Sequence, residues 1–84
     1  MSVHFILYSR SWCHLCDDML EALQRQCQGR DTTVEVIDID QDAQLLAKYD
    51  ELVPVLYGRK VPGQAQRLCH YFLDTQAVDA FLAG

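Results

Sequence analysis

A strand, an amphipathic helix and a second strand follow one another in the first 39 residues, and this succession restricts the fold strongly. Residues 3–8 are mostly apolar and precede polar residues, which predicts a short buried strand. From residue 14 apolar side chains recur with helical spacing, so we expect a helix over residues 14–28 that Gly29 closes as its C-cap. Residues 32–39 alternate and are β-branched, which predicts a second strand. A strand-helix-strand unit in one sheet implies a parallel pair with a right-handed crossover. The helical stripe consists of Cys16, Met19, Leu20, Leu23 and Cys27.

The next segment is expected to hold a helix and a hairpin. Asp40 suits the N-cap of a helix that carries Leu45, Leu46 and Tyr49. Residues 53–57 predict a third strand and residues 67–73 a fourth. Residues 58–63 between them have turn chemistry, so the two strands should be antiparallel neighbours.

The last predicted element is a helix capped by Asp74. One face of this helix carries Ala77, Val78, Phe81 and Leu82. The predicted order is therefore β-α-β-α-β-β-α, an α/β fold with a four-stranded mixed sheet covered by three helices.

The length and the net charge of the chain limit the number of domains and the kinds of binding partner that we expect. The chain has 84 residues, half of them hydrophobic, so we expect one domain over residues 1–84. Its start lacks the basic region of a signal peptide, and no stretch is long enough to span a bilayer. The net charge of −5, without a cluster of Lys or Arg, argues against nucleic acid or an anionic membrane as partner. We therefore expect a cytoplasmic monomer whose partner is a protein or a small molecule.

The four cysteines are interpreted as thiols rather than as a disulfide framework, because no export signal accompanies them. Cys13 and Cys16 lie where the first strand passes into the first helix, close enough to form a small disulfide ring. Free N–H groups and the dipole at a helix N-terminus stabilise a thiolate, so Cys13 is the expected nucleophile. Cys16 belongs to the buried stripe and suits the role of resolving thiol.

Charged neighbours should act on the pKa of Cys13 in opposite directions. Arg10 and His14 would lower it through positive charge. Asp17 and Asp18 favour the helix but oppose a thiolate. A solvated Arg10 and an exposed His14 without an energetic role are equally consistent with the sequence.

Residues 8–16, Tyr-Ser-Arg-Ser-Trp-Cys-His-Leu-Cys, resemble the glutaredoxins, with a basic residue three positions before the first cysteine of a CxxC motif. Val53-Pro54-Val55 is similar to a second signature of the thioredoxin superfamily. The resemblance implies a thioredoxin-like fold and a glutaredoxin-like thiol-disulfide oxidoreductase acting on a disulfide-containing protein or a small thiol. It also implies that Pro54 is cis beside the cysteines and that Val53 offers backbone groups to an extended substrate. A nearer similarity is to small bacterial glutaredoxin-like proteins of unassigned substrate.

Two regions depart from the glutaredoxin pattern. Glutaredoxins typically have Pro and Tyr between the cysteines, where this chain has His14 and Leu15. They also carry a Gly-Gly pair that binds the γ-glutamyl end of glutathione, where residues 71–74 here are Tyr-Phe-Leu-Asp. Bulky side chains and an acid should hinder an anionic tripeptide. We therefore expect no tightly bound cofactor and keep glutathione only as a candidate reductant.

Other notable residues have simpler interpretations beside the functional ones. Trp12 could anchor its loop, but the contact role is favoured because tryptophan is enriched in interface hot spots. Cys27 is expected to be a small core residue. Cys69 and His70 should face opposite sides of a strand and serve the structure.

Two rival functions use the same motif. Cys13 and Cys16 could form half of a metal site, but no second CxxC or His pair has the spacing for the other half. By family analogy, an iron-sulfur cluster bridged between two chains through Cys13 is a variant of this hypothesis. The other rival is a docking domain that has kept its cysteines without catalysis.

Overall fold

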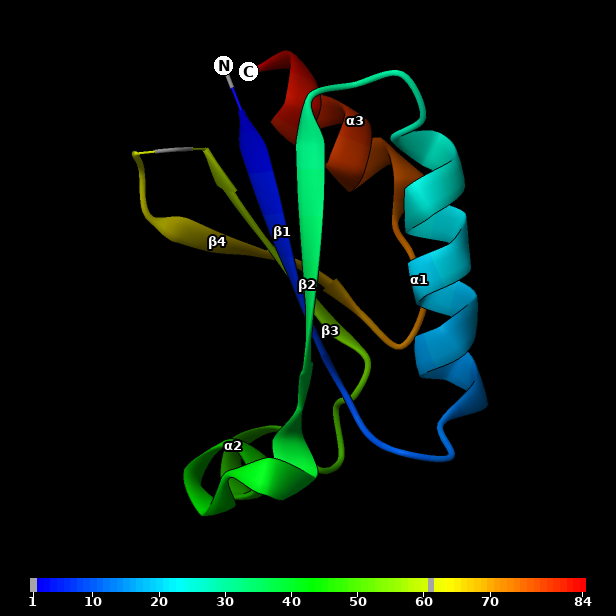
Figure 1. Ribbon diagram of the computed structural model, residues 1–84, viewed down its shortest axis with the longest axis vertical. Helices are drawn as coiled ribbons and strands as arrows, with labels where there is room; N and C mark the ends of the chain where they lie inside the picture. The colour runs from blue at the N-terminus through cyan, green and yellow to red at the C-terminus, as the bar shows by residue number, and fades with distance from the viewer. Residues whose placement is uncertain (1, 61) are drawn as a thin grey trace.

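Four strands form one mixed sheet in the computed structural model, which describes residues 2–60 and 62–84 (Figure 1). The strand order is β2-β1-β3-β4, with β1 parallel to β2, antiparallel to β3, and β3 antiparallel to β4. Three α-helices and a short 3-10 helix complete the predicted order and confirm the thioredoxin-like α/β fold. The elements are β1 (Val3–Ser9), α1 (His14–Gln26), β2 (Thr32–Asp38), η1 (Ile39–Gln41), α2 (Ala43–Tyr49), β3 (Val55–Lys60), β4 (Ala65–His70) and α3 (Thr75–Ala83).

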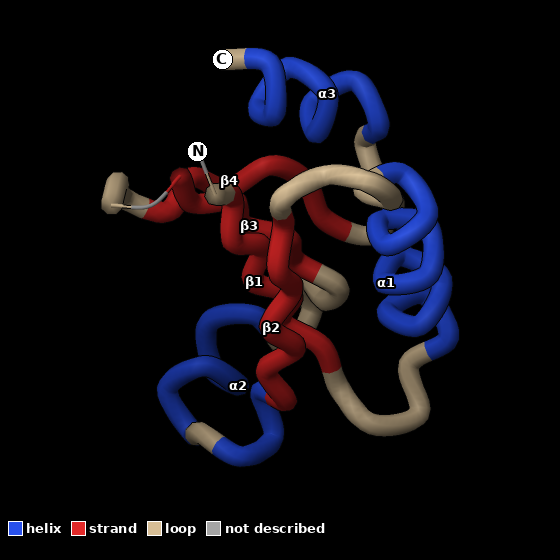
Figure 2. The backbone as a smooth tube through the Cα atoms, turned by 45° about the horizontal axis from the view of Figure 1, so that its top comes forward, coloured by secondary structure: helices blue, strands red, loops and turns tan. Residues whose placement is uncertain are grey.

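The helices divide between the two faces of the sheet, with α1 and α3 on one side and α2 on the other (Figure 2). Successive side chains of β1 alternate between these faces, as a strand requires. Phe5 and Leu7 pack against α1 and α3 through Leu23 and Val78. On the other face, α2 contributes to a smaller core of Ile39, Tyr49 and Val55, with Tyr8 and Tyr57 packed against it.

Two predicted boundaries at helix ends are wrong. Helix α1 ends at Gln26 with Cys27 as its C-cap, and Gly29 has its positive φ of 77° in the turn beyond. Helix α2 is capped by Asp42, whose side chain accepts N–H bonds from the first helical turn, and not by Asp40. The cap moves because the chain first buries Ile39 in the 3-10 turn η1.

The hairpin also lies differently from the prediction. Strand β3 runs from Val55 through Gly58 to Lys60, so residues 58–60 are strand rather than turn; position 61 of that predicted turn lies outside the described residues. Gly58 fits the strand because α3 packs closely on it: a Cβ there would lie 2.7 Å from Cε2 of Phe81. Strand β4 ends at His70 instead of residue 73, since the next residue, Tyr71, has a positive φ of 64°. The predicted Asp74 cap of α3 is confirmed by its bond from the Ala77 N–H at 3.0 Å.

Candidate active site

Cys13 and Cys16 form a disulfide at the start of α1, with their Cα atoms 5.2 Å apart. Cys13 is the N-cap of the helix and has extended backbone angles. The backbone N–H of Cys16 donates to Sγ of Cys13 at 3.2 Å. Once the disulfide is reduced, the same N–H and the helix dipole favour negative charge on that sulfur.

The two cysteines differ in accessibility, as the helical stripe predicted. Cys16 is buried, with 3% of its surface exposed, and faces the core side of α1. Cys13 is only partly buried. A partner can therefore reach Cys13, whereas Cys16 is shielded from other molecules.

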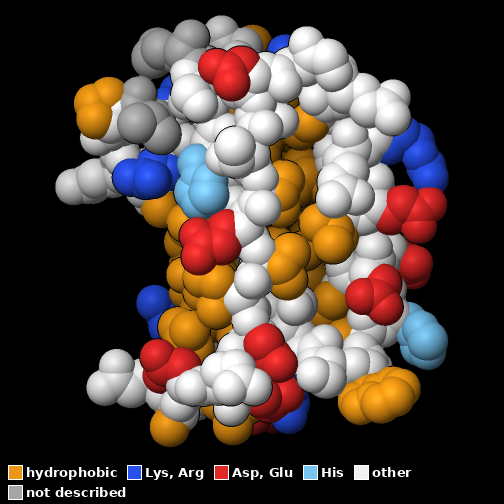
Figure 3. Space-filling model, viewed as in Figure 1, with side chains coloured by type: hydrophobic (Ala, Val, Ile, Leu, Met, Phe, Trp, Pro, Cys, Tyr) orange, Lys and Arg blue, Asp and Glu red, His pale blue; other side chains and the backbone are white. Residues whose placement is uncertain are grey.

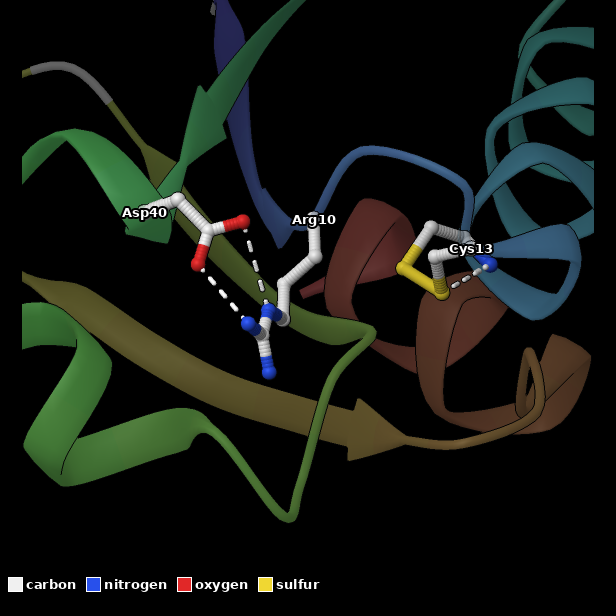
Figure 4. Close-up of a disulfide and its surroundings, with 4 residues drawn as sticks. Arg10, Cys13 and Asp40 are labelled. Carbon is white, nitrogen blue, oxygen red and sulfur yellow. Dashed lines mark hydrogen bonds and ion pairs between the residues drawn. A yellow bond between two sulfur atoms is a disulfide. The ribbon is translucent and has the colours of Figure 1, made fainter.

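Arg10 lies beside the site but its charge is directed elsewhere. Its Nη2 contacts Oδ1 of Asp40 at 2.9 Å, and its Nε donates to Oδ2 at 3.3 Å. Figure 4 shows the guanidinium on Asp40, pointing away from the disulfide. Next to it, the hydroxyl of Ser11 donates to Asp38 at 3.3 Å. These contacts attach the loop between β1 and α1 to the end of β2 and to η1.

Trp12 and His14 flank Cys13 on the outside of the protein. Trp12 is 99% exposed and has a positive φ of 62°, so its ring does not anchor the loop. His14 is exposed at the first position of α1. Both side chains are free to meet a partner that approaches Cys13.

The Val53-Pro54 peptide bond is cis, as the family resemblance implied, and Pro54 is fully buried. The next residue, Val55, pairs with Tyr8 near the end of β1, only a few residues before Cys13. The cis-proline segment and the loop before α1 therefore lie at the same end of the sheet. Val53 is partly buried and packs against the smaller core of Ile39, Tyr49 and Val55.

Tyr71 holds the cis-proline segment in place and was not predicted as a site residue. Its N–H donates to the carbonyl of Pro54 at 2.9 Å, and its hydroxyl donates to the carbonyl of Glu51 at 2.6 Å. The aromatic run after His70 looks like a continuing strand in sequence, which hid this role. A tyrosine with positive φ directly after a strand is a structural signal that only the backbone reveals.

A depression of about 180 Å³ lies between α1 and the loop from β4 to α3. Its wall on α1 starts with Leu15, the residue before Cys16, and its other wall holds Tyr71, Phe72 and Leu73. Sequence reasoning considered residues 71–74 only as a hindrance to glutathione binding and gave Leu15 no role of its own. The loop before α3 thus lies beside the first turns of α1 and, through Tyr71, against the cis-proline segment.

The other two cysteines are outside this site. Cys27 is buried in the core, and burial raises the pKa of its thiol, which agrees with the predicted structural role. Cys69 packs against the same core, and burial also raises its pKa, while a backbone hydrogen bond from Asp74 acts in the opposite direction. His70, its neighbour, is exposed.

Two further features were sought in the described part of the chain: a cluster of metal-binding side chains and a helix that could span a membrane. Among residues 2–60 and 62–84, no three His, Cys, Asp or Glu side chains are grouped as metal ligands. None of the described helices has the length and apolar character needed to cross a membrane.

Comparisons with known proteins agree with this geometry. The model of the glutaredoxin-like domain (DUF836) family matches residues 4–83. Protein Ne2328 from Nitrosomonas europaea is 34% identical, covering 96% of this chain and 92% of its own, with a TM-score of 0.72. Protein XcR50 from X. campestris is 33% identical, covering 94% of this chain and 95% of its own, with a TM-score of 0.62.

More distant structures share the fold. Mitochondrial thioredoxin 3 from Saccharomyces cerevisiae, in its oxidized form, is 18% identical and has a TM-score of 0.70 over 98% of this chain and 77% of its own. No curated protein matches the chain. The family match over almost the whole chain, together with a CxxC disulfide on a thioredoxin fold, shows that the chain belongs to the glutaredoxin-like (DUF836) family.

Proposed function

We propose that the chain is a thiol-disulfide oxidoreductase that cycles the Cys13-Cys16 pair between dithiol and disulfide. The observation that carries the proposal is the difference between the two sulfurs: Cys13 caps a helix and is accessible, whereas Cys16 is buried one turn behind it. This is the arrangement that an attacking and a resolving thiol need.

Reduction of a substrate proceeds in two exchange steps. The thiolate of Cys13 attacks one sulfur of the substrate disulfide, forms a mixed disulfide and releases the other sulfur as a thiolate. Cys16 then attacks Sγ of Cys13 and its proton passes to the departing substrate sulfur, which closes the disulfide seen here and releases the second substrate thiol. Two electrons pass from the dithiol to the substrate, and an external thiol restores the dithiol.

The residues around the disulfide have matching roles in this proposal. Trp12 and His14 contact the partner, because both are exposed next to Cys13. The backbone carbonyl of Val53 pairs with the bound segment, because the Val53 N–H already donates to the carbonyl of Tyr49 at 3.1 Å, and cis-Pro54 shapes the surface on which the segment lies. Arg10 acts on the loop through Asp40 and contributes to substrate binding from there.

The proposed setting is the cytoplasm, where a dithiol of this kind is kept reduced. The protein acts as a monomer on a disulfide-containing protein or a small-thiol disulfide, without a tightly bound cofactor. Glutathione is the candidate reductant that restores the dithiol. Replacing glutathione by an NADPH-coupled thioredoxin reductase in the turnover assay identifies which of the two electron donors serves the protein.

The test compares three variants, each with one cysteine replaced, in a turnover assay with a model disulfide. Cys13→Ser should abolish reduction, because no accessible thiolate remains. Cys16→Ser should accumulate a mixed disulfide on Cys13 that mass spectrometry detects. Cys69→Ala is the matched control and should turn over like the wild type, since Cys69 lies outside the site. Equal activity of the wild type and Cys13→Ser would refute the proposal.

A further inference from the structure

Two adjoining depressions run along α1 from Leu15, the residue directly before Cys16. The α1 wall of the first depression is formed by Leu15, Asp18, Met19 and Ala22, which lie on one helical face. A second depression, of about 360 Å³, shares Ala22 and Leu73 with the first and continues to Gln26. From Leu15 to Gln26 the helix rises about 16 Å, which is the length of about five extended residues.

The near end of this groove is apolar and exposed. Leu15 and Tyr71 are more than a third exposed, and Phe72 is 70% exposed. Large apolar side chains gathered beside a reactive group mark a contact surface rather than ordinary solvent-facing positions. Leu15, the first residue of the wall on α1, comes two positions after Cys13 and directly before Cys16.

The charge around the groove is negative. Asp18 lines it, and Asp17 is exposed in the same helical turn. The nearby cations are already paired: Arg10 contacts Asp40, and Arg25, at the far end, contacts Glu21 at 2.6 Å. Figure 3 shows acidic side chains along the outer side of α1 and at the lower end of the molecule.

Such a surface discriminates between ligands by charge. Glutathione carries two carboxylates and one ammonium group, so its net charge is repelled by Asp17 and Asp18. A lysine or arginine near a substrate cysteine is attracted by the same carboxylates. Charge complementarity therefore selects a basic protein segment over the anionic tripeptide.

We infer that this groove binds an extended segment of a disulfide-bearing protein, with an apolar side chain between Leu15 and Phe72 and a lysine or arginine facing Asp18. The inference rests on the proposed redox function and names the substrate class of that site. The apolar contact holds the segment, and the basic residue sets its preference.

The experiment uses two peptides of equal length that carry one cysteine as a mixed disulfide with a coloured aromatic thiol. Both peptides carry the same apolar residue, and they differ at only one position near it, which is lysine in the first peptide and glutamate in the second. We expect kcat/KM for the lysine peptide to be about fivefold higher at low salt, as for a few exposed charge pairs. The difference should disappear at about 1 M salt, where the Debye length is about 3 Å.

Two variants locate the preference in the groove. Asp18→Asn should lower the lysine-to-glutamate ratio by about twofold, whereas Asp31→Asn, an exposed aspartate beyond the far end of α1, should leave it unchanged. Phe72→Ala should raise KM for both peptides, whereas Val36→Ala, which truncates an exposed apolar residue on β2, should not. Melting temperatures verify that all four variants are folded.

The outcomes separate the inference from the proposed function. If no substrate, including a small neutral aromatic disulfide, is reduced in a Cys13-dependent manner, the redox function itself fails. If the neutral disulfide is reduced but the two peptides react at equal rates, only the groove inference is overturned. Faster reduction of oxidised glutathione than of the lysine peptide would overturn it as well.

Discussion

Replacing Tyr71 by phenylalanine tests whether one side chain orders the cis-proline segment. The change removes only the hydroxyl that donates to the Glu51 carbonyl at 2.6 Å and leaves the N–H bond to Pro54 at 2.9 Å. A hydrogen bond of this kind contributes about 1 kcal/mol net. Because Glu51 is exposed, water can replace the lost donor. We therefore expect the substitution to lower the local stability of the segment by about 0.5–1 kcal/mol.

The assay is native-state hydrogen exchange of the backbone amides next to this segment. The N–H groups of Leu52 and Val53 both donate to the carbonyl of Tyr49, at 2.8 and 3.1 Å. In Tyr71→Phe their exchange should be about two- to fivefold faster, the equivalent of 0.5–1 kcal/mol of local opening. Amides in the middle of β1 should not change, since the opening is local.

Tyr8→Phe is the matched control, because it also removes one phenol hydroxyl, but from a ring held in the small core by stacking on Tyr49 rather than by a bond to the Glu51 carbonyl, which accepts from Tyr71. It should leave the exchange of Leu52 and Val53 at the wild-type rate. Unchanged exchange of these two amides in Tyr71→Phe would refute the reasoning. So would an equal acceleration across β1, because that result means a global loss of stability rather than a local one.

Three further predictions concern the core and its titratable groups. Gly58→Ala should lower the free energy of unfolding by about 1 kcal/mol, because its Cβ would lie 2.7 Å from Cε2 of Phe81; urea denaturation measures this, and the loss should shrink when Phe81→Ala is added. In reduced native protein at pH 8, iodoacetamide should modify Cys13 long before Cys27, because burial raises the pKa of the Cys27 thiol. Mass spectrometry of timed samples measures the two rates, and equal rates would contradict this prediction. Burial, with the hydrogen bond to a neighbouring tyrosine, raises the pKa of Tyr49 above its ordinary value of 10.0, so its contribution to stability is complete below pH 10 and falls as the pH rises further. Urea midpoints at pH 8 and pH 11 should therefore differ less in Tyr49→Phe than in the wild type, and an equal difference would show that this phenol is not involved.

Local patterns in the sequence were sufficient for the order of the elements and for the position of the cysteine pair. The change from strand to helical spacing around residue 13 placed a CxxC motif at a helix N-terminus, and the structure has it there. The same stripe that defines α1 predicted the buried position of Cys16. These features depend on periodicity and capping within one or two turns of chain, which the sequence records directly.

Boundaries depended on partners that are distant in sequence. The sequence predicts Gly58 in a turn, yet it lies in β3, where the Phe81 ring of α3 packs too closely for a larger side chain. Asp40 reads as a helix cap, yet its carboxylate pairs with Arg10 across the sheet end, and Asp42 takes the cap. Local propensity cannot report such choices, since the competing contact comes from another element.

The sequence by itself therefore determined the fold class and which two cysteines form the disulfide, because both follow from local spacing. Only the tertiary structure decided what surrounds them. It directed the charge of Arg10 to Asp40, and it brought Tyr71 onto the carbonyl of Pro54. It also opened a groove between Leu15 and Phe72. Each of these contacts joins segments at least 17 positions apart, and only the packing of the sheet and helices brings such segments together.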